Sequence, residues 1–373
     1  MCYIGENNYF SFRDGYCESL PGVSIGTAEA AKLGRVIADL FGRFSVGCDG
    51  FAHNHILYAI SSGIAESGKD VYVCENTDLP SFKFGYPILS AECGIYVSGE
   101  TALKIYFYGK NGFPINTSVL ERIMNGPPAL ASEKIGKIIA ATSFRNIYTG
   151  NIADSFENIN LPIDAGISCG SRSVRSLWQE FFTGEDDSLV FQISDNGQRV
   201  NAYSSTEGFI PYDKLILAYS SKLSQQGQAV WLPDDFHFAA DLTNERIRRF
   251  STEKGIPESA VSQRFLIDPL FMCAHLASDR EKFFKTLKEL PEISSVKREI
   301  SVTINDDIPF NKTIAENGGR IIIKKSGKSR LSLIAQACSA ETASEICSDW
   351  TEKLRHLSSS QNSNYKKSEQ IKD

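Results

Sequence analysis

The sequence predicts an α/β protein with three layered units in succession and a small C-terminal α+β domain. Through most of the chain, segments with apolar residues at helical spacing alternate with short apolar runs typical of buried strands. This alternation favours sheets covered by helices on both faces. The last part differs, because three strand-like runs are followed there by one long helix.

Length and composition exclude several classes of protein. The chain of 373 residues is long enough for two or more domains with buried cores. Its hydrophobic content of 42% and charged content of 23% argue against global disorder and a fibrous fold. The formal net charge of −6 argues against a non-specific binder of nucleic acid or anionic membranes, since those surfaces need excess Lys and Arg. We therefore expect neither partner.

The sequence also favours a cytoplasmic location. No apolar run approaches the roughly 18 residues of a spanning helix, and residues 1–13 lack the basic-then-apolar order of a signal peptide. The nine cysteines are scattered, odd in number and form no Cys-x-x-Cys pair, so we expect reduced thiols rather than disulfides or a zinc site.

The first unit is placed at residues 1–128. Thr27 suits a helix N-cap and Gly42 a helix stop, and the apolar residues between them, Leu33 and Leu40 included, recur at inward spacing. The expected elements are the helices Thr27–Phe41 and Ile56–Ala65 and the strands Phe44–Gly47, Val71–Cys74, Gly94–Val97 and Lys104–Tyr108.

The pattern restarts twice, after Gly126-Pro127-Pro128 and near Pro211. The second domain, 129–210, is expected to contain the strands Lys137–Ala141 and Leu189–Ile193 and the helix Ser173–Phe182. The third, shortened domain, 211–294, is expected to contain the helix Asp213–Leu223, the strand Ala229–Leu232 and the helices Asn244–Thr252, Pro269–Leu276 and Arg280–Leu290.

The C-terminal domain is placed at residues 295–357. Its expected elements are the strands Val296–Ile304, Arg320–Lys325 and Leu331–Ala337 and the helix Ala340–Leu357, with Ala343, Ile346, Trp350 and Leu354 on one face. Residues 358–373 contain almost no apolar side chain to offset the entropy of ordering, so a disordered tail is expected.

Generic phosphate- and metal-binding motifs are absent. The sequence contains no G-x-x-x-x-G-K-[ST], H-E-x-x-H or G-x-G-x-x-G string. His53 and His55 lie just ahead of a helix without a visible third ligand, so a solvated loop is the better interpretation than a metal site.

Whole segments carry a clearer signal. Residues 27–41 resemble the first helix of the α-D-phosphohexomutase family, residues 46–50 (VGCDG) resemble its V-G-R-D-T string, and residues 60–73 resemble its next helix and strand. The similarity to these phosphoglucomutases, phosphomannomutases and phosphoglucosamine mutases spans nearly the whole chain. It implies three α/β/α mixed-sheet domains and a small C-terminal α+β domain.

The family's phosphoserine loop, T-A-S-H-N-P, is altered here. The strand Gly94–Val97 is followed by Ser98, Gly99 and Glu100, so Glu100 stands at the phosphoserine position and Ser98 at the preceding threonine. A carboxylate has negative charge but cannot transfer a phosphoryl group. Ser98 is the alternative nucleophile.

The family's metal loop, D-G-D-G-D-R, reads S-D-N-G-Q-R here, with Gly197 and Arg199 fixing the register. The resemblance implies three ligand positions, and all are neutral: Ser194, Asn196 and Gln198. Magnesium is a hard cation that prefers carboxylate oxygens. We expect no tightly bound cofactor, and magnesium only if the protein is an active enzyme.

Two further family loops concern the substrate. For the sugar-reading G-E-x-S-G-H string, Glu258–Val261 is the nearest remnant. For the phosphate-binding R-x-S-G-T-E-P string, the counterpart has Lys324 in place of the Arg and keeps Ser326 and Gly327, followed by Lys328. These residues form a reasonable anion cradle, although an exposed basic turn explains them equally well.

These departures leave three hypotheses. The first is a pseudoenzyme of carbohydrate metabolism that binds a hexose phosphate, an active mutase or another carbohydrate enzyme. The second is an active divergent phosphohexomutase that interconverts hexose 1- and 6-phosphates, with Ser98 as phosphoryl carrier and a looser metal site around Asp195. The third is an interaction module that binds no sugar phosphate.

Overall fold

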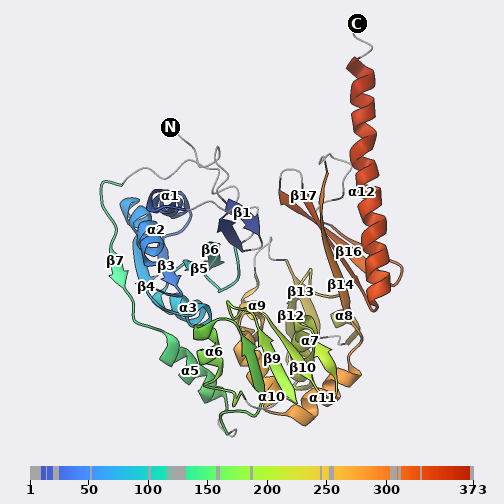
Figure 1. Cartoon of the computed structure of the whole chain (residues 1–373), viewed down its shortest axis with the longest axis horizontal. Helices are drawn as coiled ribbons and strands as arrows, with labels where there is room; N and C mark the ends of the chain where they lie inside the picture. The colour runs from blue at the N-terminus through green and yellow to red at the C-terminus, as the bar shows by residue number, and fades with distance from the viewer. Residues whose placement is uncertain are drawn as a thin grey trace. The chain divides into compact units, whose positions relative to one another are not determined.

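The computed structural model divides the chain into two compact units: residues 1–215 with 264–280, and residues 216–263 with 281–373 (Figure 1). The structure describes residues 10–13, 15–19, 25–50, 53–99, 102–115, 119, 132–156, 160–184, 188–243, 246–251, 256–302, 309, 312–327 and 330–369. In these ranges no helix combines the length and apolar character needed to cross a membrane. The eight cysteines described are free, and seven of them are buried.

The first unit contains a seven-stranded mixed sheet in the order β1-β2-β6-β5-β3-β4-β7. The strands β3, β4, β5 and β7 run parallel to one another, while β1, β2 and β6 pair antiparallel. The bounds are β1 Phe10–Arg13, β2 Tyr16–Ser19, β3 Arg43–Cys48, β4 Asp70–Cys74, β5 Cys93–Ser98, β6 Lys104–Gly109 and β7 Ile138–Ala140.

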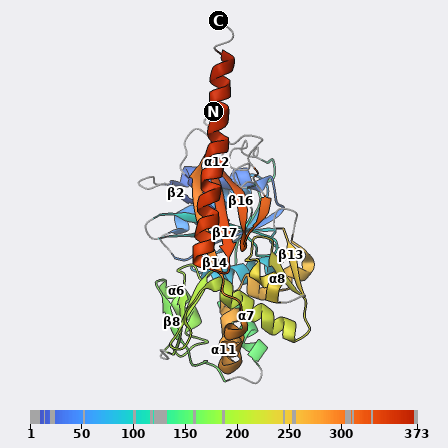
Figure 2. The ribbon, with the colours of Figure 1, turned by 90° about the vertical axis from the view of Figure 1, so that its right-hand side faces the viewer.

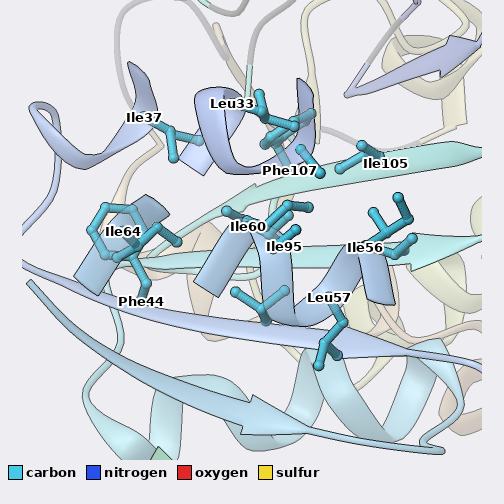
Figure 3. Close-up of a cluster of buried hydrophobic side chains, with 14 of the residues drawn as sticks. Leu33, Ile37, Phe44, Ile56, Leu57, Ile60, Ile64, Ile95, Ile105 and Phe107 are labelled. Carbon is cyan, nitrogen blue, oxygen red and sulfur yellow. The ribbon is translucent and has the colours of Figure 1, made fainter. Parts of the chain in front are cut away.

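Helices cover both faces of this sheet. Successive side chains of its central strands point to opposite faces, and both sets are buried. Ile95 and Val97 of β5 face α1 (Thr27–Ala38) and α2 (Asn54–Glu66), as Figure 3 shows for the residues around Ile95. Tyr96 belongs to the opposite cluster with α3 (Leu79–Gly85) and the short helix Tyr86–Leu89. Ser98, at the end of β5, is thus held between two packed layers.

The second sheet of the first unit has four strands in the order β11-β10-β9-β8. Trp178 is fully buried beside it, with its ring stacked on Phe182 at 5.5 Å and tilted against Phe191 at 6.1 Å. The elements are β8 Gly166–Cys169, β9 Leu189–Ile193, β10 Val200–Ser204, β11 Gly208–Ile210, α5 Arg145–Ala153, α6 Arg172–Trp178 and α10 Pro269–Ala277, with short helices at Asp154–Phe156 and Arg264–Leu266.

The second unit contains a parallel strand pair and a four-stranded antiparallel sheet in the order β14-β17-β16-β15. The helix α12 packs on β14, β17 and β16 and extends beyond the sheet (Figure 2). The bounds are β12 Val230–Pro233, β13 Ile247–Phe250, β14 Ser294–Ser301, β15 Lys312–Glu316, β16 Gly319–Gly327, β17 Arg330–Ala337, α8 Ala239–Thr243, α9 Glu258–Val261, α11 Arg280–Glu289 and α12 Ala340–Glu369; α7, Tyr212–Gln225, spans the division between the units.

The predicted fold class is confirmed, and most predicted elements lie where the periodicity places them. The helix expected at Asn244–Thr252 is wrong, because Ile247–Phe250 forms the strand β13 in parallel register with β12. The spacing of Ile247 and Phe250 suits a helix, but pairing with β12 decides the conformation. The strand predicted to open the second domain, β7, joins the first sheet beside β4.

The C-terminal ends of three helices also differ from the predicted ones. The helix α1 stops at Ala38 rather than Phe41, which leaves Leu40 46% exposed instead of buried, and α6 stops at Trp178 rather than Phe182. The helix α12 continues to Glu369, past the end predicted at Leu357, so residues 358–369 are helical rather than a disordered tail. No Gly or Pro interrupts this stretch, and only its apolar face ends near Leu357.

The domain boundaries at 128, 210 and 294 stay predictions. The helix α10, expected in the third domain, lies in the first unit, and its buried residues include Leu270, Met272 and Cys273. The described part of the expected third domain contains one pair of strands, β12 and β13.

A close helix crossing gives a test of this packing. A Cβ added to Gly34 would lie 2.1 Å from the Ile60 carbonyl oxygen, so Gly34→Ala should lower the free energy of unfolding by at least about 2 kcal/mol. Gly150→Ala is the matched control, because nothing lies within 4 Å of a Cβ there; we expect it to be neutral or stabilising by about 0.5–1 kcal/mol. Urea unfolding measures the free energy of unfolding of both variants. Equal changes in the two variants would contradict the close contact between α1 and α2 at Gly34.

Candidate functional site

A cavity of about 520 Å³ lies in the first unit between the two sheets. Its volume falls in the range of small-molecule sites, about 300–1,000 Å³. The ends of β3, β5 and β9 and the start of α6 contribute most of its wall. The lining residues are Glu18, Asp49, Leu79, Tyr96, Ser98, Gly99, Ala102, Lys104, Tyr106, Gly170, Ser171, Ser173, Val174, Ser194, Asp195 and Asn196.

The cavity brings together Ser98 with Ser194 and Asn196, which come from the two loops singled out in the sequence. Ser98 is 8% exposed at the end of β5. Burial raises the pKa of the adjacent Tyr106, and hydrogen bonds from Asn196 and Ser98 oppose this rise. Glu100 lies outside the described residues, so its position in the loop stays a prediction.

The loop between β9 and β10 is closed by its own hydrogen bonds. The Ser194 hydroxyl accepts the Arg199 N–H at 3.0 Å and donates to Asn196 Oδ1 at 2.8 Å. The same Asn196 oxygen accepts the Gln198 N–H at 3.1 Å. Gly197 has φ +69°, a left-handed turn conformation that glycine adopts without strain. The side-chain oxygens of Ser194 and Asn196 are therefore engaged within the turn.

Asp195 also lines the cavity, although the family register suggests that it points elsewhere. Its Oδ1 accepts the Ser171 N–H at 3.2 Å. A Cβ on Gly170 would lie 2.4 Å from this oxygen, so the glycine permits the carboxylate to approach. Asp195 thus joins the β9–β10 loop to the segment that follows β8.

Gln198 does not line the cavity. Its Oε1 accepts a hydrogen bond from the buried Nζ of Lys83, on α3. Lys83 also donates to the Ile267 carbonyl oxygen at 3.1 Å, and its Nζ lies 5.0 Å from the centre of the Tyr108 ring. Burial lowers the pKa of Lys83 from 10.5 to about 7, while the Asp268 carboxylate opposes this shift.

The structure was compared with known proteins. It resembles a protein assigned as a phosphomannomutase from Thermus thermophilus, with a TM-score of 0.63 and 13% identity over 93% of this chain and 99% of that one. A phosphoglucomutase/phosphomannomutase family protein from Burkholderia thailandensis gives 0.64 and 11%, over 92% and 97%. The N-acetylphosphoglucosamine mutase of Aspergillus fumigatus gives 0.51 and 8%, over 95% and 96%.

The chain has the phosphohexomutase fold. No protein-family model matches the sequence. A search of the curated proteins gives no match either. The likeness is therefore one of fold, and the chemistry of the phosphohexomutase loops has to be judged from the side chains present here.

The residues at the phosphohexomutase metal positions do not fit a magnesium ion. The oxygens of Ser194 and Asn196 are held by hydrogen bonds within the turn, and Gln198 Oε1 is bound to the Lys83 ammonium. A metal on Gln198 Oε1 would compete with the Lys83 amine for one neutral oxygen, whereas magnesium prefers carboxylate oxygens. Within the described residues, no group of three His, Cys, Asp or Glu side chains could hold a metal ion.

The predicted phosphate-binding residues lie in the second unit, at the turn between β16 and β17. Lys324 forms an ion pair with Asp235, with Nζ 2.6 Å from Oδ2, so its charge is already partly balanced. Lys325 and Arg330 are exposed on the same hairpin. The backbone of Ser326 and Gly327 belongs to β16, and Lys328 lies outside the described residues.

Sequence reasoning missed several residues of this fold. The strings compared with the family do not contain Lys83, Glu18, Lys104 or Asp235, and residues 46–50 contain Asp49 without marking it as a site residue. Glu18, Asp49 and Lys104 line the cavity. Asp49 comes just after the predicted strand Phe44–Gly47, and a carboxylate at a strand end was the available signal. The strand that contains Glu18, β2, is not among the predicted strands. No sequence signal pairs Lys83 with Gln198, 115 positions away.

The pH dependence of stability tests the burial of Lys83. Because its folded pKa of about 7 lies below its unfolded value of 10.5, the folded state binds fewer protons between these values, and stability should rise with pH across that window. Lys83→Met should flatten this rise. Chemical unfolding at several pH values measures it, with the exposed Lys110→Met as control; an unchanged pH profile in Lys83→Met would contradict the assignment.

Magnesium titration tests the metal positions. Thermal unfolding of the protein should show the same Tm with excess magnesium and with a chelator, since a ligand stabilises only the state that binds it. The double variant Ser194→Asp, Asn196→Asp adds two carboxylates beside Asp195 at the cavity wall and should gain a magnesium-dependent Tm. A saturable rise in the Tm of the unaltered protein would show that its neutral positions do bind the metal.

Proposed function

We propose that this phosphohexomutase-like protein binds a hexose phosphate without transferring its phosphoryl group. The observation that carries the proposal is the Lys83–Gln198 contact, together with the turn closed by Ser194 and Asn196. Phosphoryl transfer depends on positioning and on neutralising charge at the phosphate oxygens. At the three positions that the resemblance assigns to the metal, the β9–β10 loop has the neutral side chains Ser194, Asn196 and Gln198, so the charge neutralisation that transfer requires is missing.

A sugar-phosphate ligand is supported by two features. The first is the fold, which the chain shares with proteins named for hexose phosphates. The second is the basic β16–β17 hairpin, where Lys325 and Arg330 are exposed and the Ser326-Gly327 pair of the family string is kept. Cations beside backbone N–H groups form charge-assisted contacts with phosphate.

Ser98 supports a second candidate function, that of an active mutase. Its side chain lines the cavity and is hydrogen-bonded to Tyr106. A displaced nucleophile at this position would therefore face a ligand bound in the cavity. Tyr106 cannot act as the base that activates Ser98. Burial raises the pKa of its phenol, so the phenol stays protonated and does not accept the serine proton. The binding function is therefore favoured. A partner enzyme as the ligand is a further alternative.

A coupled assay separates the two functions. Purified protein with glucose, mannose or glucosamine 1-phosphate, magnesium and catalytic hexose bisphosphate should give no turnover above that of Ser98→Ala, beside an active mutase as positive control. Turnover at an ordinary enzymatic rate that disappears in Ser98→Ala would establish the mutase instead.

Calorimetric titration tests the binding half of the proposal. We expect glucose 6-phosphate or another hexose phosphate to bind, and Arg330→Glu to weaken binding at least about tenfold, since a charge-assisted contact contributes about 1.5–3 kcal/mol. Lys285→Glu is the matched control, because Lys285 is exposed on α11, away from the hairpin in sequence. Equal affinity in Arg330→Glu and Lys285→Glu would exclude the hairpin as the phosphate site.

A further inference from the structure

The first lysine of the β16–β17 hairpin is paired with a carboxylate from another part of the second unit. Asp235 Oδ2 lies 2.6 Å from Lys324 Nζ, and the two side chains are 40% and 37% exposed. Lys324 stands opposite Ser332 on β17, and Arg330 lies two positions before Ser332. Side chains two positions apart in a strand share a face of the sheet, so Lys324 and Arg330 lie on one face. The carboxylate of Asp235 therefore occupies a position beside Lys324 that a phosphate oxygen would otherwise take.

The segment that presents Asp235 is held along its backbone by side-chain donors. The five consecutive carbonyls of residues 233–237 each accept a hydrogen bond from Arg249, Arg320 or Gln336. Arg249 alone donates to three of them, at 2.9–3.1 Å. Gln336 Nε2 donates to the carbonyl of Asp235 itself at 2.8 Å. Because this backbone is already fixed, the ion pair costs little further ordering of the chain.

A phosphate group that binds Lys324 has to compete with this carboxylate. Both are anionic oxygen ligands of the same ammonium, and a carboxylate that stayed beside a bound phosphate would repel it. The carboxylate has an advantage in this competition, since a group fixed next to its partner acts at a high effective concentration. Binding of phosphate at Lys324 is therefore an exchange of one anion for another.

We infer that Asp235 is an internal counter-ion of Lys324 that a phosphate group must displace, and that it thereby sets the affinity of the hairpin for phosphate. This inference rests on the proposed function, in which the hairpin holds the phosphoryl group of a hexose phosphate. All of the groups involved belong to the second unit. The contact between Asp235 and Lys324 opens when the ligand binds and closes again when the ligand leaves.

Calorimetric titration of the full chain with glucose 6-phosphate and with inorganic phosphate tests the role of Asp235. Asp235→Asn removes the charge of the side chain and keeps its shape, so both ligands should bind more tightly. Asp234→Asn is the matched control, because it changes the net charge equally at an exposed neighbour and leaves the pair with Lys324 in place. We expect Asp235→Asn to bind each ligand at least about threefold more tightly than Asp234→Asn does.

The dependence on salt gives a second readout. In the unaltered protein the ligand replaces one charge pair by another, whereas in Asp235→Asn it creates a new pair, so affinity should fall more steeply with ionic strength in the variant. Equal affinities in Asp235→Asn and Asp234→Asn, or weaker binding in Asp235→Asn, overturn the inference and leave the proposed function standing. If neither the unaltered protein nor Asp235→Asn binds either ligand, the proposed function fails, and this inference with it.

Discussion

The first unit depends on a buried lysine that links three of its segments. Lys83 joins α3 to the β9–β10 loop through Gln198 and to the Ile267 carbonyl, so three segments distant in sequence depend on one cation. Removing a charge from water is costly unless polar groups surround it. Two carbonyl-type oxygens and the face of Tyr108 offset part of that cost, and burial still lowers the pKa of Lys83 to about 7. Gln198 is engaged in this contact and does not line the cavity.

The cavity of the first unit gathers residues from segments that are far apart in the sequence. Ser98, Ser194 and Asn196 meet at its wall. The side-chain oxygens of Ser194 and Asn196 are engaged in hydrogen bonds within the β9–β10 turn. The proposed function separates binding from transfer, because transfer also requires charge stabilisation at the phosphate oxygens.

The sequence predicts the layered fold well where periodicity and burial agree, as in α2 and β5. It fails at β13, where a charged segment becomes a strand through pairing with β12, and at α6, where the predicted helix end lies beyond Trp178. For the site, comparison with the family's loop motifs locates Ser98, Ser194 and Asn196. The hydrogen-bond partner of Gln198 and the ion-pair partner of Lys324 are residues far away in the sequence. Contacts of that kind depend on tertiary packing, which local patterns do not encode.

The claim that this protein does not carry a phosphoryl group is tested most directly by its intact mass. The purified chain is incubated with glucose 1,6-bisphosphate and magnesium, and its mass is measured before and after, beside an active mutase treated in the same way. The proposed function predicts an unchanged mass, because the neutral side chains Ser194, Asn196 and Gln198 do not hold the metal ion that would neutralise a transferring phosphoryl group. A gain of one phosphate that maps to Ser98 and is absent in Ser98→Ala would contradict it.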